Sequence, residues 1–273
     1  MSPEQILSRL QKLSEQEILR TLVKQYVAPD FDEAFEKADR ILCISPHPDD
    51  CEVGAGGIIA KYADMGKEVT YIVMTDGSMG THDPNLSPEE LVVIRKKEQE
   101  EAAKILGVRK IYWLNYRDGE LSFNTGTRNR LITLIRAIKP DIVLAPDAWL
   151  PYESHPDHVN TGKLAAAAVI MASLPHFNPE DRERGLQPWR TKYMAFYYTS
   201  RPNKFIDITN HFSKKLEAIK RHESQFAHSW QLMQNLITLI AMLYGRKIGV
   251  KYADAVKLLP TFLLHAIPVA EYI

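Results

Sequence analysis

From Ile41 onward, short runs of β-branched and aromatic residues alternate with longer stretches in which apolar residues recur every three or four positions. This alternation is typical of βαβ units and predicts a mainly parallel sheet covered by helices. The predicted fold is therefore α/β, a Rossmann-like three-layer arrangement. We expect four clear strands and two weaker ones, at residues 41–45, 69–75, 110–114, 141–146, 193–199 and 205–208.

Capping residues mark the most clearly bounded of the predicted helices. Ser87 and Glu90 form a capping box, and Pro88 suits the first helical position. Gly107 then suits the left-handed residue that closes a helix. These signals predict a helix over residues 89–106.

The chain is expected to form one domain, residues 1–273, because no internal repeat or low-complexity linker interrupts the sequence. Apolar residues three and four positions apart predict a helical extension over residues 1–38. The stretch 173–188 predicts one long loop. Residues 236–243 are hydrophobic nearly all round a helix, which predicts burial on several sides, one of them supplied by an oligomer contact.

Composition narrows the range of partners. With 34 Lys and Arg against 34 Asp and Glu, the chain has no formal net charge, so we expect neither nucleic acid nor a membrane as partner. The two cysteines, Cys43 and Cys51, are too few for a disulfide framework and predict free thiols in a reducing compartment. The opening residues lack the apolar core of a signal peptide. The expected location is cytoplasmic.

Polar side chains follow four of the expected strands, at the edge where open α/β sheets bind ligands. Pro-His-Pro-Asp-Asp occupies 46–50 after the first strand, and His-Pro-Asp-His occupies 155–158 after the fourth. His47, Asp50 and His158 form a zinc-compatible donor set, and three protein ligands leave a fourth position for water. We therefore predict a catalytic metal site.

The remaining residues of the two motifs suit catalysis. Asp49, next to a ligand, is the natural general base. His155 can stabilise an oxyanion or protonate a leaving nitrogen. Asp157 can orient one of the histidines without contacting the metal itself. Each motif alone would indicate only a proline-containing turn. Two motifs after separate strands favour the metal site.

Other chemical signals are weaker. Residues 54–57 (Gly-Ala-Gly-Gly) fail as a dinucleotide fingerprint, because Ile59 stands where the third glycine belongs. Residues 222–226 miss the zincin motif and predict a solvated helix face. Cys51 lies beside the proposed ligands, but we expect it to pack as a small hydrophobe.

Two aromatic residues, Trp149 and Tyr152, lie between the fourth strand and the second motif. This position makes them candidates to stack on a sugar ring. The alternative is that they are core residues, as aromatics near strand ends usually are.

At these motifs the sequence resembles the LmbE-like (PIG-L) family of zinc-dependent de-N-acetylases, whose marks are Pro/Ala-His-Pro-Asp-Asp after the first strand and a later His-Pro-Asp-His. The resemblance is strongest to the diacetylchitobiose deacetylase branch and covers nearly the whole chain. It is carried by residues 45–51, 74–77, 94–98, 112–118, 149–158 and 244–250.

The resemblance implies one zinc ion per subunit, bound by His47, Asp50 and His158. It implies Asp49 as general base and His155 as the residue that stabilises the tetrahedral intermediate.

The resemblance further implies that Arg95 and Asp118 bind sugar hydroxyls, and that His265 reaches a neighbouring subunit's site in a hexamer. The sequence departs from many members of the family in one place. They carry Glu directly after the two aspartates, whereas Cys51 precedes Glu52 here.

The resulting hypothesis is a hydrolase that removes the N-acetyl group from N-acetylglucosamine-containing saccharides, such as diacetylchitobiose, and releases acetate. One alternative is a de-N-acetylase of an inositol- or malate-linked glucosaminide. A site for the malate conjugate would need an extra cation near the aglycone. The other is a metal- or nucleotide-binding protein that keeps the fold without the chemistry.

Overall fold

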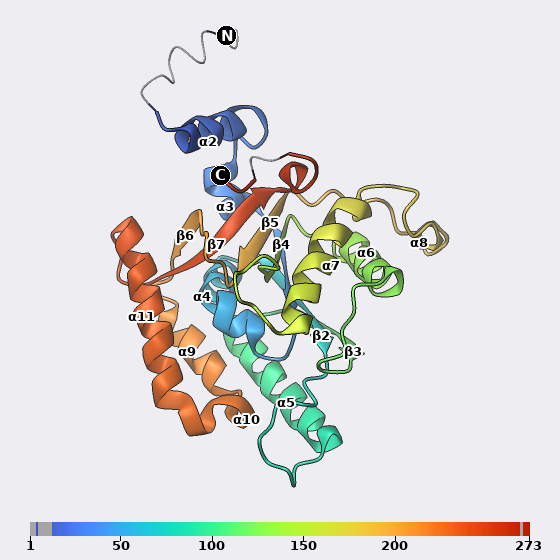
Figure 1. Cartoon of the computed structure of the whole chain (residues 1–273), viewed down its shortest axis with the longest axis vertical. Coiled ribbons are helices and arrows are strands. Elements are labelled where there is room, and N and C mark those ends of the chain that lie inside the picture. The colour runs from blue at the N-terminus through green and yellow to red at the C-terminus, as the bar shows by residue number, and fades with distance from the viewer. Residues whose placement is uncertain (1–3, 5–12, 268–269) are drawn as a thin grey trace.

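A single mixed sheet runs through the molecule (Figure 1). The computed structural model describes residue 4 and residues 13–267 and 270–273, and in these residues seven strands have the order β3-β2-β1-β4-β5-β7-β6. Strands β1 to β5 are parallel, whereas β7 runs antiparallel to β5 and β6. The predicted α/β fold is confirmed. The strands are β1 (Arg40–Ser45), β2 (Glu68–Thr75), β3 (Lys110–Tyr116), β4 (Ile142–Pro146), β5 (Tyr193–Tyr197), β6 (Lys204–Asp207) and β7 (Ala253–Pro260).

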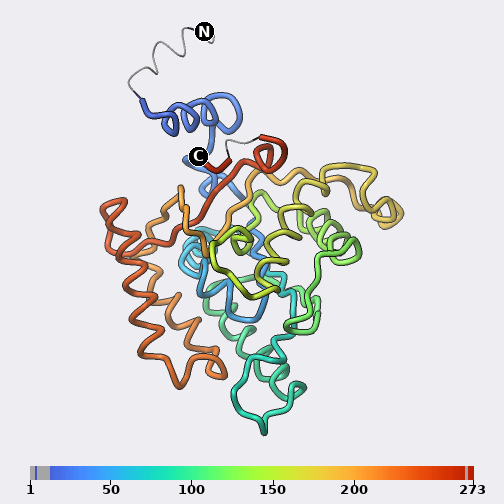
Figure 2. Tube along the Cα trace, in the orientation of Figure 1, coloured from blue at the N-terminus to red at the C-terminus, as the bar shows by residue number. Residues whose placement is uncertain are grey.

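Alternation of side chains along the strands builds one core on each face of the sheet. In β1, Ile41 and Cys43 pack on one face, and Leu42 and Ile44 pack on the other. Helices α4, α5 and α9 cover the first face, and α6 and α7 cover the second (Figure 1). Figure 2 shows the orange α9 beside α4, although it comes much later in the chain. The main helices are α2 (Glu15–Tyr26), α3 (Ala34–Lys37), α4 (Asp50–Asp64), α5 (Pro88–Leu106), α6 (Thr125–Ile138), α7 (Pro156–Ala172), α8 (Glu180–Glu183), α9 (Phe212–Lys220), α10 (Glu223–Phe226) and α11 (Trp230–Ile248).

All six predicted strands are present, with ends shifted by one or two residues, but β7 was not predicted. Asp254 and Lys257 interrupt the apolar run of β7, yet both are buried. Lys215 pairs with Asp254 at 2.5 Å, and Lys257 donates to the carbonyl oxygen of Glu271. Partners distant in sequence therefore make a buried strand from a pattern that is not purely apolar.

The predicted capping box of α5 is confirmed. Ser87 Oγ accepts from the Glu90 N–H at 3.3 Å, and the Glu90 carboxylate accepts from the Ser87 N–H at 3.0 Å. Gly107 ends the helix with φ +79°, a left-handed conformation that glycine adopts without steric cost. Side chains of this helix reach the loop after β1.

Two other sequence expectations have mixed outcomes. Helices α2 and α3 lie within the predicted extension over 1–38, and residues 1–3 and 5–12 of it lie outside the described residues. The prediction of one long loop over 173–188 is wrong, because α8 forms inside it. Asp181 of α8 is buried and pairs with Arg136 at 2.8 Å.

Helix α11 packs on β6 and β7 through only part of its surface. Ile237 and Ala241 are buried, whereas Leu239 and Leu243 are 54% and 49% exposed. Within one chain this segment is buried on one side only, and the expected burial of a further side by an oligomer contact stays a prediction. In the residues that the structure describes, no helix is both long and apolar enough to cross a membrane.

A disulfide joins Cys43 of β1 to Cys51 of α4, with the Cα atoms 6.4 Å apart. Both residues are fully buried. The prediction of free thiols is therefore wrong, because β1 and α4 bring the two side chains face to face. A reducing compartment can no longer be inferred from the cysteines.

The order of the strands creates a crevice at the carboxyl end of the sheet. β1 pairs with β2 on one side and with β4 on the other. The strands after β1 therefore extend the sheet first toward one edge and then toward the opposite edge. The loops after β1 and β4 leave from neighbouring strands. Residues that are about a hundred positions apart in sequence can therefore meet.

Gly162 sets how closely α7 approaches this edge. A Cβ atom at Gly162 would lie 2.4 Å from the carbonyl oxygen of Pro146 and 2.8 Å from Ala148 Cβ. Both neighbours belong to β4 or the residues after it. The absence of a side chain therefore lets the first turns of α7 lie against the end of β4.

Gly162→Ala is expected to destabilise the protein. The overpacking cost of about 3 kcal/mol exceeds the roughly 1 kcal/mol gained in helix propensity, so the free energy of unfolding falls by about 2 kcal/mol. Urea unfolding measures the change, with Lys163→Ala on the exposed side of the same helix as control. A Gly162→Ala protein as stable as the control would contradict this view of the contact.

Candidate metal centre and catalytic residues

Three metal-compatible side chains converge at the crevice. His47 lies in the loop after β1, Asp50 begins α4, and His158 lies in the first turn of α7. Asp50 sits between the histidines, with Oδ2 3.2 Å from His47 Nδ1 and Oδ1 3.3 Å from His158 Nε2. The structure thus brings together the three residues proposed from the sequence as ligands.

The donor chemistry of these side chains suits a zinc ion. Asp50 approaches the two histidines through different oxygens, and one donor atom from each of the three residues lies within 4.8 Å of the other two. Two imidazoles and one carboxylate are also a donor set that leaves a fourth position for water.

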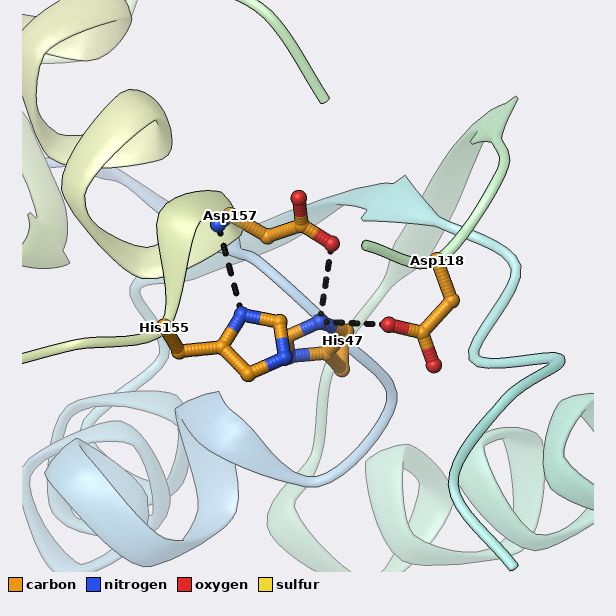
Figure 3. A group of neighbouring side chains, drawn as sticks. All are labelled: His47, Asp118, His155 and Asp157. Carbon is orange, nitrogen blue, oxygen red and sulfur yellow. Dashed lines mark hydrogen bonds and ion pairs between the residues drawn. The ribbon is translucent and has the colours of Figure 1, made fainter. Parts of the chain in front are cut away.

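The other nitrogen of His47 faces two carboxylates (Figure 3). His47 Nε2 is 3.1 Å from Asp157 Oδ2 and 3.1 Å from Asp118 Oδ1. Asp157 is fully buried and also accepts hydrogen bonds from the backbone N–H groups of Gly119 and Leu121. These carboxylates fix the orientation of the His47 ring, so that Nδ1 is directed at Asp50.

Negative charge dominates the surroundings of His47. Burial opposes a charge on the ring, but hydrogen bonds to Asp118, Asp157 and Asp50 outweigh it and raise the pKa of His47 to about 12. Burial also favours protonation of Asp50, yet the charges of His158 and His47 hold the pKa of Asp50 well below its usual range. The cluster therefore requires positive charge, supplied by protons on the imidazoles or by a metal ion that replaces them.

Asp49 has an unusual backbone and a separate environment. As the N-cap of α4 it has φ +110° and ψ −29°, and in the described chain its side chain makes no capping bond. Its carboxylate instead pairs with Arg95 at 3.1 Å. Burial raises the pKa of Asp49 to about 6, with Asp50 adding to the rise and Arg95 opposing it. A pKa in this range suits a general base near neutral pH.

His155 is the N-cap of α7, and its Nδ1 accepts a hydrogen bond from the Asp157 N–H at 3.3 Å. Burial and the charges of His47 and His158 lower the pKa of His155, so the neutral ring is favoured. A neutral ring that accepts at Nδ1 carries its proton on Nε2. His155 therefore offers an N–H donor beside His47, whose ring centre is 4.6 Å away (Figure 3).

The residues predicted to bind sugar occupy different environments. Arg95 and Asp118 are buried beside the site, where Arg95 contacts Asp49 and Asp118 contacts His47. Trp149 is 62% exposed, and its ring packs edge-on against Phe196.

Two further candidates are exposed. Tyr152 is fully exposed, with φ +70°, so it is not a core residue. His265 is exposed beside Trp149, in a cavity that does not include the three donors.

Two residues at the site were missed by the sequence analysis. The hydroxyl of Tyr198 is 3.4 Å from Asp50 Oδ1, and its ring stacks on that of His158. Glu153 Oε2 lies 3.4 Å from His158 Nδ1. Tyr198 directly follows β5, so the rule that ligand-binding residues follow parallel strands could have found it.

A buried polar group behind Asp49 was also missed. Gln99 of α5 bonds to the backbone of Asp49 and to the carboxylate of Glu52, and His222 lies 3.7 Å from the same carboxylate. His222 is fully buried, so the prediction that residues 222–226 form a solvated helix face is wrong at this position. Packing of α5 on α4, and of α10 on α5, brings these residues together.

A cavity of about 490 Å³ opens beside His158. This size is typical of small-molecule sites. Leu150, Glu153 and Tyr198 line it on the side of the metal centre, and Ile237 and Tyr244 of α11 line it on the other. The candidate site therefore extends from the crevice toward α11.

A mainly parallel α/β sheet, a His-Asp-His donor set at its switch point and an adjacent carboxylate of raised pKa together define a metal-dependent hydrolase. Comparison with known proteins gives the family. A family model described as GlcNAc-PI de-N-acetylase, PIG-L, matches residues 42–169, which include all three donors. The chain belongs to the PIG-L family of de-N-acetylases.

Relatives in this family cover most of the chain. Diacetylchitobiose deacetylase of Thermococcus kodakarensis is 45% identical over 88% of this chain and 91% of its own length. The N,N'-diacetylchitobiose deacetylase of Pyrococcus horikoshii, solved with its inhibitor MPG, is 46% identical, with a TM-score of 0.90 over 95% of this chain and 98% of that one. A probable N-acetyl-α-D-glucosaminyl L-malate deacetylase 2 of Bacillus anthracis is 31% identical over 68% of this chain and 81% of its length.

His47→Ala is expected to abolish metal binding. Loss of a residue that hydrogen-bonds to a metal ligand already weakens metal affinity about 10–100-fold. Loss of the ligand itself should therefore weaken metal affinity by more than about 100-fold. Metal analysis of the purified protein measures the effect, with the exposed His176→Ala as a matched control. Full metal content in the His47→Ala protein would exclude His47 as a ligand.

Proposed function

We propose that this chain is a zinc-dependent hydrolase that removes the N-acetyl group from N-acetylglucosamine-containing saccharides, with diacetylchitobiose as the preferred substrate. The observation that carries the proposal is the donor set of His47, Asp50 and His158 with Asp49 directly beside it. Similarity to two diacetylchitobiose deacetylases over most of the chain supports the choice of substrate. Zinc is preferred because two imidazoles and one carboxylate are a donor set typical of zinc.

The three donors, Asp49 and His155 have different roles in the proposed reaction. A divalent ion held by the three donors would polarise the acetamide carbonyl and lower the pKa of a water molecule. Asp49 takes a proton from the attacking water, and the Nε2–H of His155 donates to the carbonyl oxygen as negative charge develops there. The water oxygen bonds to the carbonyl carbon, the C–N bond then breaks, and the leaving nitrogen takes up the proton held by Asp49. The products are a free amine and acetic acid, which loses its proton to solvent to give acetate.

The cavity beside His158 favours a neutral saccharide over a malate conjugate. Among the described residues that line it, Lys215 is the only Lys or Arg, and its ammonium group pairs with Asp254 at 2.5 Å. A malate group would need a free cation to offset its charge. Sugar hydroxyls need no such cation, and the proposed contacts with sugar are those of Arg95, Asp118, Trp149 and Tyr152, which lie outside the lining of this cavity.

We further propose a homo-oligomer, with a hexamer as the expected form and His265 directed at a neighbouring subunit's site. The half-exposed apolar side chains of α11 support an oligomer, because such a surface is costly to leave in water. The cytoplasmic location expected from the sequence stays a prediction.

An acetate-release assay tests the proposed function. The panel contains N-acetylglucosamine, diacetylchitobiose, and the malate- and inositol-linked glucosaminides, each with and without chelator. We expect the highest kcat/KM for diacetylchitobiose and loss of activity with chelator that added zinc restores. Release from the malate or inositol conjugate alone would favour the alternative de-N-acetylases, and no release from any of them would favour a binding protein of the same fold.

Asp49→Asn is expected to keep the metal and to lower kcat by about 10²–10⁴-fold, because the amide cannot accept the proton from water. Metal content and kcat are measured on the same sample. Asp83→Asn, in an exposed loop, serves as control. An unchanged kcat in the Asp49→Asn protein would remove Asp49 from the role of base.

A further inference from the structure

One peptide group in the loop after β1 is held at both of its polar ends. The carbonyl oxygen of Pro48 accepts a hydrogen bond from Arg95 at 2.7 Å, and the N–H of Asp49 donates to Gln99 Oε1 at 3.0 Å. These two groups belong to the same peptide unit. Arg95 and Gln99 are four residues apart on α5, so they project from one face of that helix.

This peptide group precedes the residue with the least favourable backbone in the loop. Asp49 has φ +110°, a conformation that residues with a side chain rarely adopt. The conformation keeps its carboxylate off the N-terminus of α4, where aspartate usually caps. The carboxylate of Asp49 pairs with Arg95, whereas that of Asp50 belongs to the donor set.

The amide group of Gln99 is itself oriented. Its Nε2 donates to Glu52 Oε1 at 2.8 Å, which leaves Oε1 of Gln99 to accept from the Asp49 N–H. Gln99 and Glu52 are both fully buried. His222, also fully buried, lies 3.7 Å from the second oxygen of Glu52. Because the group is sealed from water, Gln99 cannot exchange these partners for solvent.

We propose that Gln99 is a positioning residue for the reaction. Its hydrogen bond to Glu52 orients its amide group, which in turn fixes the backbone of Asp49. The Asp49 carboxylate can then act as base while the Asp50 carboxylate binds the metal. The hydrogen bonds of the Gln99 side chain go to the Asp49 N–H and to Glu52, and not to the donor set. The proposal rests on the proposed function, in which Asp49 is the base. It gives a role to Glu52, which follows the inserted Cys51.

The first test is Gln99→Met, which keeps the length of the side chain but removes both hydrogen bonds. We expect kcat to fall about 10–100-fold, as misplacement of a reacting group by about 1 Å can cost 10²-fold, with KM and zinc content unchanged. Hydrogen exchange of the backbone over residues 46–50 should become faster. Lys97→Met, exposed on the same helix, is the matched control and should match the wild type.

The second test exchanges the two partners. Gln99→Glu alone places two buried carboxylates against each other and should lower kcat. Adding Glu52→Gln restores the pattern, because the carboxylate introduced at position 99 can accept from both the Asp49 N–H and the amide introduced at position 52. We expect the double variant Q99E/E52Q to regain most of the kcat lost by Q99E, together with the slow exchange over residues 46–50.

Each outcome supports or overturns positioning by Gln99. Rescue of kcat in Q99E/E52Q, with zinc content constant throughout the series, supports it. Wild-type kcat in Gln99→Met overturns it, and so does a double variant that regains its melting temperature but not its turnover. If Asp49→Asn retains full activity, the proposed base has failed instead, and that result is independent of the exchange data on Gln99.

Discussion

The ring of His47 is the point on which the site depends, because its two nitrogens connect three separate parts of the chain. Nδ1 faces Asp50 at the start of α4, and Nε2 faces Asp118 in the loop after β3 and Asp157 at the start of α7. Three carboxylates around one buried imidazole would repel one another without a cation among them. Positive charge at this point, from protons on the imidazoles or from a bound metal ion, therefore stabilises the folded crevice.

The cost of the Asp49 conformation is small enough for its neighbours to offset. A strained backbone costs about 1–3 kcal/mol, and the capping bond that Asp49 does not make is worth about 1 kcal/mol. Against this stand the neutral bond from the Asp49 N–H to Gln99, worth about 1 kcal/mol, and the charged bond from Arg95 to Pro48, worth about 1.5–3 kcal/mol. The two sums are similar, so the strained backbone of Asp49 is compatible with a stable loop.

Much of the fold and the core of the site could be predicted from the sequence, because both depend on local pattern. Strand periodicity located six strands, and the two His-containing motifs lay one directly after β1 and the other at the end of the loop that follows β4. The strand β7 was missed because Lys215 and other distant partners neutralise its polar residues. Gln99 and His222 were missed for a related reason: a buried polar residue on a helix looks like a solvated one until its partner is known.

The disulfide between Cys43 and Cys51 makes a covalent ring of the segment that carries His47, Asp49 and Asp50. A ring this small removes about 2.5 kcal/mol of chain entropy from the unfolded state. The ring therefore limits how far His47 can separate from Asp50 in a chain that has lost its sheet.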